Sequence, residues 1–407
     1  MEDLATTAER AATAVPETLA APRNGMRFDV AMLTSVHWAL DDRIFHREAK
    51  TIAAAGVSCC VIGPYPASAF VEGVWIEALP KQTSRLKRAF MGWTVLRKAL
   101  QIGKRVFIFH DPELFGVGLL LRLCGKHVVY DCHENLPMQL LQKDWIPKPL
   151  RWVLLPWVWL AEWLGARLLS GVISAAEVML PRFPKKRSAL IRNFPIRAAL
   201  EHNRGGIPIQ LRDDVVVYAG GLSRIRGIRE LVAAFRAPEL SHAQLWLLGP
   251  FESEEFQREI MSSLPPNARW LGLKDHSEVL KTYPATKIGA CLLYPTPSHR
   301  HSQPIKLYEY MAAGLPIVAS NFPEFAPVLE GCGVLVNPYD VDKIRTALVA
   351  MLSDSAKLAE MSLVAQTRAL ESFVWEKEGQ KLVDLCRQLG AGPGKVVDSH
   401  AGVQVQS

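Results

Sequence analysis

The sequence of 407 residues lacks several features that would point to particular protein classes. Its longest apolar stretch lies between residues 151 and 162, about half the ~20 residues that a membrane-spanning helix needs, so no spanning segment is expected. Its seven cysteines are an odd number with no CxxC pair, which argues against a disulfide framework and favours a reducing compartment. The sequence has no repeat at a solenoid period and no tight metal-ligand spacing such as HExxH.

Acidic residues are scarce in the first half of the chain. Residues 27–193 contain 23 Lys and Arg against 13 Asp and Glu, whereas the whole chain has a formal net charge of +7. This uneven charge indicates an anionic partner for the first half. Because no nucleic-acid recognition motif is present, we expect an anionic membrane surface and no nucleic acid.

The two ends of the chain lack the patterns of folded elements. Residues 1–25 carry several acidic side chains and no continuous apolar stretch, so they do not read as a secretory signal. We predict a flexible lead over residues 1–25 and a flexible, Gly-rich tail over residues 391–407. A cytoplasmic location, peripheral at the inner membrane, is the expectation that follows.

Short apolar, β-branched runs alternate with stretches of helical period along the rest of the chain. The runs cover residues 28–35, 57–63, 105–110, 127–133, 171–175 and 189–193 in the first half, and 214–221, 244–249, 288–295, 315–320 and 332–338 in the second. Such runs are typical of parallel strands covered by helices on both faces. They predict an α/β fold of two tandem Rossmann-like domains, residues 26–195 and 196–390, with a cleft between them.

A glycine-rich loop follows the first predicted strand of the second half. Gly220 and Gly221 come directly after the strand, and Gly227 opens the next helix. Glycines let the backbone approach a ligand closely, and a helix N-terminus favours an anion. Arg224 and Arg226 add charge where a diphosphate would lie. The alternative is a tight turn with solvated arginines.

A short helix is predicted to begin at Pro304 and to end before Gly314, since proline suits a first turn and glycine suits the position after a helix. Lys306 and Glu309 are three residues apart and therefore share one face. A carboxylate there can accept hydrogen bonds from two ribose hydroxyls, and an ammonium group can bind phosphate. The alternative is an ordinary Lys–Glu pair on the surface.

The run KLYEYMAAGLPIVAS closely resembles the C-terminal signature of glycosyltransferase family 4, whose members have the GT-B fold of two Rossmann-like domains. In that family the glutamate of the run binds the ribose of a nucleotide sugar, which implies this role for Glu309. The residues just before the helix, His301, Ser302 and Gln303, are assigned to the donor site with it. The segment YAGGLSRIRGIRELVAAF resembles the family's diphosphate-binding loop and places Arg226 where many members carry lysine.

Two positions depart from the family pattern. Many members have a second glutamate eight residues before the ribose-binding one, where this chain has His301. Many also have an arginine five residues before the lysine matched by Arg226, where this chain has Gly221. Both departures weaken any transfer of donor-sugar identity from the family.

The segment FHDPELFGVGLLLRLCGKHVVYDCHENLP resembles the HDPEL and YDxHE segments of many bacterial members. His110, Asp111 and His133 follow two successive predicted strands, so we expect them at one sheet edge and assign them as catalytic candidates. The resemblance implies that His133 lies near the donor sugar. The alternatives are a histidine bonded to nearby backbone and a metal cluster.

Some glycosyltransferases hold a metal with an Asp-x-Asp pair, and this chain contains Asp340 and Asp342. Here the pair precedes an amphipathic helix, which predicts that it caps the helix. We therefore expect no metal and no cofactor, with the nucleotide sugar as a substrate.

The loop after the first strand contains His37, Asp42 and Arg43, and its surroundings resemble the family's opening strand and acceptor-side loop. The resemblance implies acceptor contacts near these residues. An ordinary polar loop is the alternative.

A basic stretch at residues 81–105 has eight Lys and Arg and no acidic residue. Its Arg85, Lys87, Arg88 and Trp93 predict a helical surface that lies on anionic lipid. The apolar residues between the charges could instead form the core face of the helix. A tryptophan-rich run over residues 145–163 is a second interfacial candidate.

These features predict a hexosyl-type glycosyltransferase that moves a sugar from a nucleotide sugar to a membrane-associated, lipid-linked or polysaccharide acceptor. No side chain stands out as a covalent nucleophile, and the resemblance implies retention of configuration, with the leaving phosphate helping to deprotonate the acceptor. A nucleotide-sugar epimerase of GT-B fold and a non-catalytic nucleotide-sugar-binding partner are the alternatives.

Overall fold

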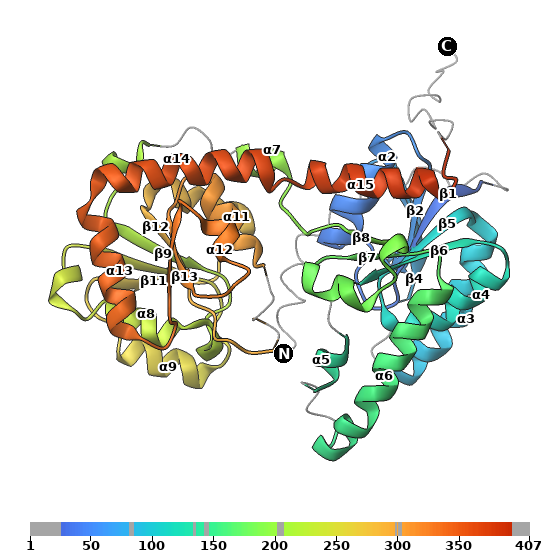
Figure 1. Ribbon diagram of the computed structural model, residues 1–407, viewed down its shortest axis with the longest axis horizontal. Coiled ribbons are helices and arrows are strands. Elements are labelled where there is room, and N and C mark those ends of the chain that lie inside the picture. The colour runs from blue at the N-terminus through green and yellow to red at the C-terminus, as the bar shows by residue number, and fades with distance from the viewer. Residues whose placement is uncertain are drawn as a thin grey trace, which may run out of the picture. The chain divides into compact units, whose positions relative to one another are not determined.

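The computed structural model describes residues 26–80, 85–132, 136–141, 146–201, 207–297, 299 and 303–392, and only the backbone at 85–90, 138 and 139. The chain forms two compact units, one from Met1–Arg192 together with Glu378–Ser407 and the other from Asn193–Lys377 (Figure 1). The first change of unit falls near the boundary expected after residue 195. At Glu378 the chain returns to the first unit, because the last helix packs there. From the sequence, all of residues 196–390 are expected in the second domain.

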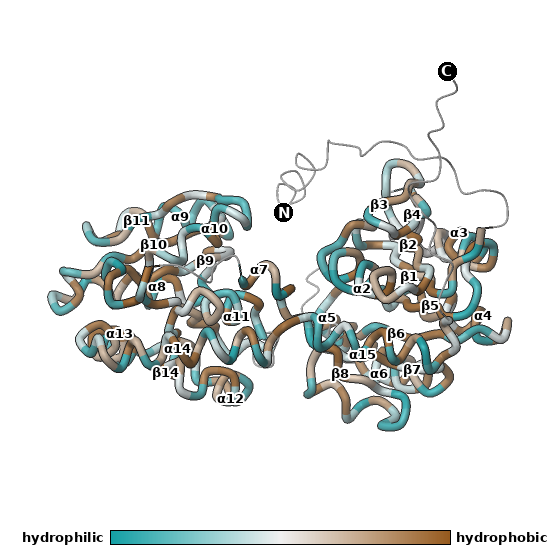
Figure 2. Tube along the Cα trace, turned by 90° about the horizontal axis from the view of Figure 1, so that it is seen from above, coloured by the Kyte–Doolittle hydropathy of each residue, from teal (hydrophilic) through white to brown (hydrophobic). Residues whose placement is uncertain are grey.

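The first unit contains one sheet with the strand order β3-β4-β2-β1-β5-β6-β7-β8. Its strands are β1 (Phe28–Leu33), β2 (Cys59–Pro64), β3 (Ala69–Val71), β4 (Val74–Leu79), β5 (Gly103–Phe109), β6 (His127–Cys132), β7 (Gly171–Ser174) and β8 (Ser188–Leu190). All neighbouring strands are parallel except β3 and β4. The central strands are buried along their whole length, and Figure 2 shows hydrophobic strands inside the unit with hydrophilic segments at its periphery.

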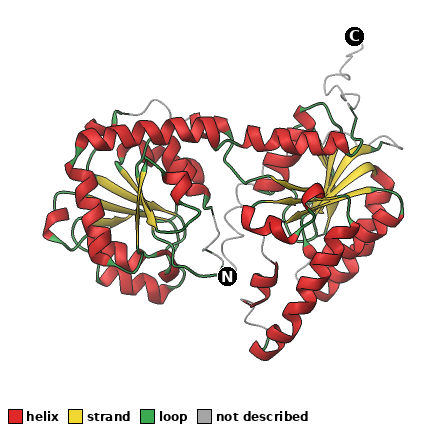
Figure 3. Cartoon of the chain, viewed as in Figure 1, coloured by secondary structure: helices red, strands yellow, loops and turns green. Residues whose placement is uncertain are grey.

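Helices cover both faces of this sheet (Figure 3). On one face α3 (Arg85–Ile102), α4 (Phe115–Leu123) and α6 (Lys148–Leu168) share a core with the strands. The π-helical segment η1 (Asp42–Ala49) packs on β2 and continues into α2 (Lys50–Ala54). The last helix, α15 (Trp375–Gln388), is tied to α2 by a hydrogen bond from Arg387 to the carbonyl of Ala55. The remaining segments are η2 (Pro112–Leu114), α5 (Leu136–Leu141), η3 (Glu177–Arg182) and η4 (Lys185–Arg187).

The second unit contains a parallel sheet with the order β11-β10-β9-β12-β13-β14. Its strands are β9 (Val215–Ala219), β10 (Gln244–Leu248), β11 (Ala268–Trp270), β12 (Ile288–Cys291), β13 (Ile317–Ser320) and β14 (Gly333–Val336). Its helices and 3-10 turns are α7 (Arg197–Glu201), η5 (Ile209–Leu211), η6 (Arg224–Arg226), α8 (Ile228–Ala234), η7 (Pro238–Leu240), α9 (Glu254–Ser262), α10 (His276–Thr282), η8 (Tyr283–Ala285), α11 (Ile305–Ala312), α12 (Ala326–Leu329), α13 (Val341–Ser353) and α14 (Ser355–Ser372). One apolar cluster joins α8, α9 and α13 to the sheet, and another joins α10, α11 and α12.

The expected α/β fold with two parallel-sheet domains is confirmed, and every expected strand overlaps an observed one. Three short strands were not expected: β3 and β4, which form a hairpin at the edge of the first sheet, and β11, at the edge of the second. β3 and β11 are edge strands of three residues each, too short to show the apolar run that marks a central strand, and in β4 the charged Glu77 interrupts such a run.

Candidate active site

The short helix α11 is held firmly at its C-terminal end. It runs from Ile305 to Ala312, after Pro304 and before Gly314, whose φ is +70°. Arg212 donates to the carbonyl of Ala313 over 3.1 Å, and the hydroxyl of Ser362 donates to the carbonyl of Gly314 over 2.6 Å. These bonds satisfy carbonyl groups that a helix leaves open at its C-terminus. The helix bounds agree with those expected from the proline and the glycine.

Glu309 is buried on α11, with 6% of its surface exposed. Its Oε1 lies 2.7 Å from Nε2 of His276, the first residue of α10. Burial, followed by the Glu309 charge, raises the pKa of Tyr283 well above its ordinary value. A capping box formed by Asp275 and Glu278 begins α10, and the sequence gave no sign that His276 contacts Glu309.

Two cations converge over the glycine loop after β9. Lys306 is buried, and its Nζ has no hydrogen-bond partner among the described residues. A Cβ added at Gly220 would lie 2.9 Å from Lys306 Nζ and 3.4 Å from Arg226 Nη1. Gly220 has a φ of +126°, which L side chains rarely adopt. The bare backbone of Gly220 therefore lets the loop approach two positive groups that have no acidic partner in the described part of the chain.

Arg224 belongs to a different cluster. Its guanidinium lies 3.1 Å from Glu252, 3.5 Å from Glu255 and 3.1 Å from Glu259, and it stacks over Phe256. Three carboxylates neutralise it, so Arg226 and Lys306 supply the free positive charge beside the loop. The expectation that Arg224 shares this task with Arg226 is not supported by these contacts.

His299 is a further residue of this region that the sequence did not single out. Burial and the charges of Arg226 and Lys306 lower its pKa, so the imidazole lies in the same positive field. Gln303 accepts a hydrogen bond from the hydroxyl of Tyr308 over 3.0 Å. His301 and Ser302, expected in the donor site, lie outside the described residues, as does His133.

Asp111 fastens the loop that follows β1 in the first unit. Its Oδ2 accepts hydrogen bonds from the Thr34 hydroxyl over 2.8 Å, from the backbone N–H of Ser35 over 2.6 Å and from that of Val36 over 3.2 Å. Its other oxygen lies 3.4 Å from Nε2 of His37. Asp111 is thus a buried support for the sheet edge, and His37 is the partly exposed group beside it.

His110 and Arg43 belong to a buried ionic cluster beneath the same edge. Arg43 binds both oxygens of Asp131, over 2.9 and 2.8 Å, and lies 3.0 Å from Glu48. His110 Nδ1 lies 2.9 Å from Asp131. Burial opposes the positive form of Arg43, yet the charges of Asp131 and Glu48 raise its pKa. Arg43 is therefore a core residue and presents no exposed group to an acceptor.

Glu48, His110 and Asp131 offer ligand atoms close enough to hold a metal ion. Arg43 already neutralises Asp131 with two bonds, and burial raises the pKa of Glu48 well above its ordinary value. Metal ligands must be deprotonated and available, so an arginine-paired carboxylate and a carboxyl group whose pKa is raised are both poor ligands. The cluster fits an internal support of the sheet better than a metal centre.

The acidic residues near the start of η1 bind groups of residues close to them in the sequence. Asp41 accepts hydrogen bonds from the backbone N–H groups of Arg43 and Ile44. Burial would raise the pKa of Asp41, but bonds from His37 and from these N–H groups hold it below its usual value. Asp42 forms an ion pair with the buried Arg47.

In the second unit, Asp340 caps α13 through the N–H of Lys343, as the sequence predicted.

Two solved structures share the fold over most of both chains. Sucrose-phosphate synthase from Thermosynechococcus elongatus superposes with a TM-score of 0.68 at 17% identity, covering 89% of this chain and 99% of that one. The Anabaena HepE protein in complex with UDP superposes with a TM-score of 0.62 at 16% identity, covering 88% and 100%. Residues 213–354 also match the family model described as "Glycosyl transferases group 1". Residues 213–354 are thus similar to group 1 glycosyl transferases, and the chain has the GT-B fold of two parallel-sheet α/β domains.

A curated relative of this chain is a GDP-mannose-dependent monoacylated alpha-(1-6)-phosphatidylinositol monomannoside mannosyltransferase from Corynebacterium glutamicum. It is 24% identical over 168 residues, which is 40% of this chain. The aligned segment spans 42% of that relative's length, less than half. The family match contains Gly220, Arg226, Lys306 and Glu309, so the second unit carries the part of the site that the family shares.

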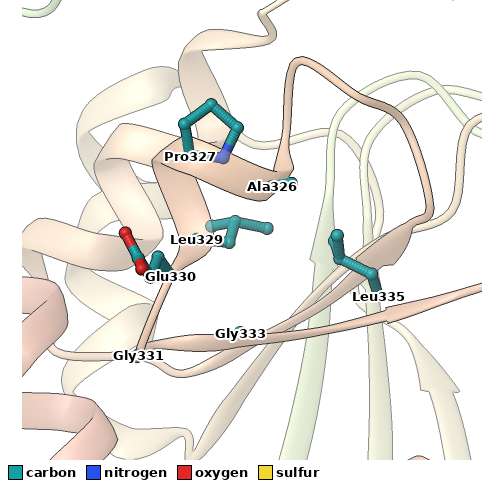
Figure 4. Close-up of a pocket in the computed structure, with 7 residues that line it drawn as sticks. All are labelled: Ala326, Pro327, Leu329, Glu330, Gly331, Gly333 and Leu335. Atoms are coloured by element: carbon teal, nitrogen blue, oxygen red, sulfur yellow. The ribbon is translucent and has the colours of Figure 1, made fainter.

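A separate pocket of the second unit lies between α12 and the beginning of β14 (Figure 4). It is lined by Ala326, Pro327, Leu329, Glu330, Gly331, Gly333 and Leu335. Glu330 is its one ionisable side chain, and none of the residues assigned from the sequence lines it. The pocket is at the amino end of its strand, whereas ligands of open α/β sheets bind at carboxyl ends. We assign it no part in the transfer.

The basic helix α3 divides its side chains between core and solvent. Val95 and Leu96 are buried in the core of the first unit, while Trp93 is 66% exposed. The side chains of Arg85, Lys87 and Arg88 lie outside the described residues. Part of the apolar pattern of α3 therefore forms a core face. Within the described residues, the protein has no helix that is long and apolar enough to cross a membrane.

Proposed function

We propose that the protein transfers a sugar from a nucleotide-diphosphate sugar, with the second unit as the donor-binding unit. The observation that carries this proposal is the buried pair of α11, Glu309 and Lys306, beside Gly220 and Arg226. Glu309 would accept hydrogen bonds from the ribose hydroxyls, and Lys306 and Arg226 would bind the diphosphate. Fold neighbours with bound UDP or UDP-glucose support a nucleotide sugar as the donor.

The acceptor in this proposal is a lipid-linked or polysaccharide intermediate at the inner face of a membrane. A relative whose name specifies a phosphatidylinositol mannoside supports a glycolipid, and the basic first half of the chain supports an anionic surface. We assign the acceptor to the first unit. There His37 is partly exposed at the carboxyl end of β1, beside the Asp111 carboxylate.

The proposed reaction is a hexosyl transfer with retention of configuration and without a metal. Lys306 and Arg226 would neutralise the charge that develops on the leaving diphosphate, which is the task that a metal ion performs in other transferases. His133 follows β6 by one residue, and we propose that it lies near the donor sugar. The leaving phosphate, rather than a side chain, would help to take the proton of the acceptor hydroxyl.

The test begins with a panel of nucleotide sugars, each added to the purified protein in a thermal-shift measurement. A bound donor stabilises the folded state according to its concentration relative to its dissociation constant. Transfer is then assayed with the donor that binds. Glu309→Ala and Lys306→Met should abolish the shift, whereas Arg224→Met is the matched control, because carboxylates already neutralise Arg224.

Three results would refute the proposal or part of it. If the Glu309→Ala variant folds and still transfers sugar at the wild-type rate, Glu309 does not bind the donor. If the donor is converted equally fast with and without an acceptor, the protein acts on the nucleotide sugar itself, as an epimerase would. Binding without any conversion would indicate a non-catalytic partner.

A further inference from the structure

Helix α6 exposes an apolar face to solvent. Between Trp152 and Leu164, every residue that is exposed to solvent is apolar: Trp152, Val153, Pro156, Trp157, Trp159, Leu160, Ala161 and Leu164. At ~1.5 Å per residue this stretch is about 20 Å long. Soluble proteins rarely leave a continuous apolar surface of this kind uncovered.

The two charged residues of α6 between Arg151 and Leu164 are both buried. Arg151 is buried and donates to the carbonyl groups of Ile146 and Leu141 over 2.6 and 2.8 Å. Glu162 is also buried and pairs with Arg182. The helix is thus polar toward the protein and apolar toward its surroundings, which is the reverse of an ordinary surface helix. The amino-terminal half of α6 extends beyond the end of the sheet in Figure 1.

Basic residues surround the carboxyl end of this apolar face. Arg122 donates to the carbonyl of Leu168, and Arg187 donates to those of Arg167 and Leu169, each over 3.3 Å. Lys185 and Lys186 are exposed next to Arg187. Lys148 is exposed at the other end of the helix. An apolar strip with basic ends matches the layering of an anionic bilayer, whose acyl region borders negatively charged headgroups.

We propose that the outer face of α6 docks into the interfacial layer of an anionic phospholipid membrane. Tryptophan favours this layer because its ring is apolar while its N–H can reach water or headgroups. Three indoles of the strip are exposed, and that of Trp163 is partly exposed under the guanidinium of Arg167. This inference rests on the membrane location proposed above and identifies the surface that would bind the membrane. The sequence pattern favours α3 for this surface, and we assign it to α6.

The experiment measures co-sedimentation of the full chain with two kinds of vesicle, phosphatidylcholine alone and phosphatidylcholine mixed equally with phosphatidylglycerol. The double variant Trp157→Glu with Leu160→Glu changes two exposed positions, so the fold should be retained. We expect its binding to the mixed vesicles to fall by about tenfold or more. Trp93→Glu on α3 and Leu363→Glu on α14 are matched controls with similarly exposed side chains, and both should bind like the wild type.

Quenching of tryptophan fluorescence by brominated phosphatidylcholine in the mixed vesicles provides a second reading, because it reports contact with lipid directly. Wild-type binding by the double variant would overturn the proposal, as would loss of binding only in Trp93→Glu. A dimer that dissociates in the double variant while vesicle binding persists would also overturn it, and would show that a second copy covers α6. If the double variant does not fold, Trp157→Ser with Leu160→Ser takes its place.

Donor binding by thermal shift is measured on the same proteins. It should be unchanged in the double variant, since α6 contains no donor residue. A failure of the membrane proposal would therefore leave the transferase proposal standing, and the reverse also holds.

Discussion

Nε2 of His276 lies 2.7 Å from Oε1 of Glu309, so the carboxylate that we propose for ribose binding is already hydrogen-bonded in the free protein. Two-thirds of the His276 side chain is exposed, whereas that of Glu309 is buried. The imidazole can therefore move aside at little cost. A nucleotide sugar would replace it on one oxygen of the carboxylate.

This relationship predicts opposite outcomes for two substitutions. Glu309→Gln removes a charge-assisted acceptor worth about 1.5–3 kcal/mol, so donor affinity should fall roughly 10- to 100-fold. His276→Ala removes a competitor, so the affinity should stay the same or rise by a few-fold. Calorimetric titration with the donor distinguishes the two. Equal losses in both variants would mean that His276 itself binds the donor.

A second prediction concerns Gly220. Alanine at this position meets a φ of +126° and places its Cβ 2.9 Å from Lys306 Nζ, so it should lose about 1–3 kcal/mol of unfolding free energy and also donor affinity. Gly272→Ala is the matched control, since φ is +78° there and a Cβ meets no atom within 4 Å. It should lose stability without losing affinity. Urea unfolding and donor titration measure the two effects, and unaltered donor affinity in Gly220→Ala would contradict the proposed diphosphate position.

A third prediction separates two neighbouring acidic residues. Asp111→Ala leaves the buried hydroxyl of Thr34 and two loop N–H groups without their acceptor, so it should lower the free energy of unfolding by about 3 kcal/mol. Glu113→Ala removes one partly buried bond from Ser35 and should cost below about 1 kcal/mol. Urea unfolding compares them. A smaller loss for Asp111→Ala than for Glu113→Ala would contradict its role as a support of the loop.

A fourth prediction follows from the buried carboxyl group of Glu48. Burial and the adjacent Asp131 raise its pKa above the ordinary value of 4.5, so the folded state binds its proton more tightly than the unfolded state. This contribution to stability is fully present below pH 4.5 and is lost as the pH rises toward the folded-state pKa. Glu48→Gln resembles the protonated form at every pH. Above pH 4.5 the Glu48→Gln variant should therefore become more stable than the wild type. The difference in unfolding free energy should grow by up to about 1.4 kcal/mol per pH unit until the pH reaches the folded-state pKa of Glu48.

Urea unfolding of both proteins between acid and neutral pH measures this difference. Glu113→Gln, at an exposed position two residues after Asp111, is the control and should follow the wild type. A stability difference that does not change with pH would show that Glu48 titrates normally in the folded state.

The local features of the site were predictable from the sequence because they depend on neighbouring residues. The strands appear as apolar runs, α11 is bounded by Pro304 and Gly314, and the Asp340 cap follows from its place before a helix. The burial of Glu309 agrees with the role that the family signature implied. The three-residue spacing of Lys306 and Glu309 alone also allowed an ordinary ion pair on the surface.

Contacts between distant segments could not be predicted in this way. The carboxylates around Arg224 lie 28 to 35 residues away, and Asp131 is 88 residues from Arg43. The bond between His276 and Glu309 spans 33 residues. Arg224 was assigned to the donor site by its charge beside the loop, and Arg43 to the acceptor side by its place after the first strand and by the family resemblance. Neither assignment could allow for these contacts, because a sequence does not tell a free guanidinium from one that is already paired.

The path of the chain has a practical consequence for dissecting the protein. Since the polypeptide leaves the first unit after Arg192 and rejoins it at Glu378, the second unit is an insertion in the first. Cutting the gene at residue 192 would remove Glu378, which accepts a hydrogen bond from the N–H of Arg192, and Gly390, whose carbonyl binds Arg105. The donor half can be expressed alone as one uninterrupted fragment, whereas the other half needs its C-terminal helix supplied through a short artificial linker.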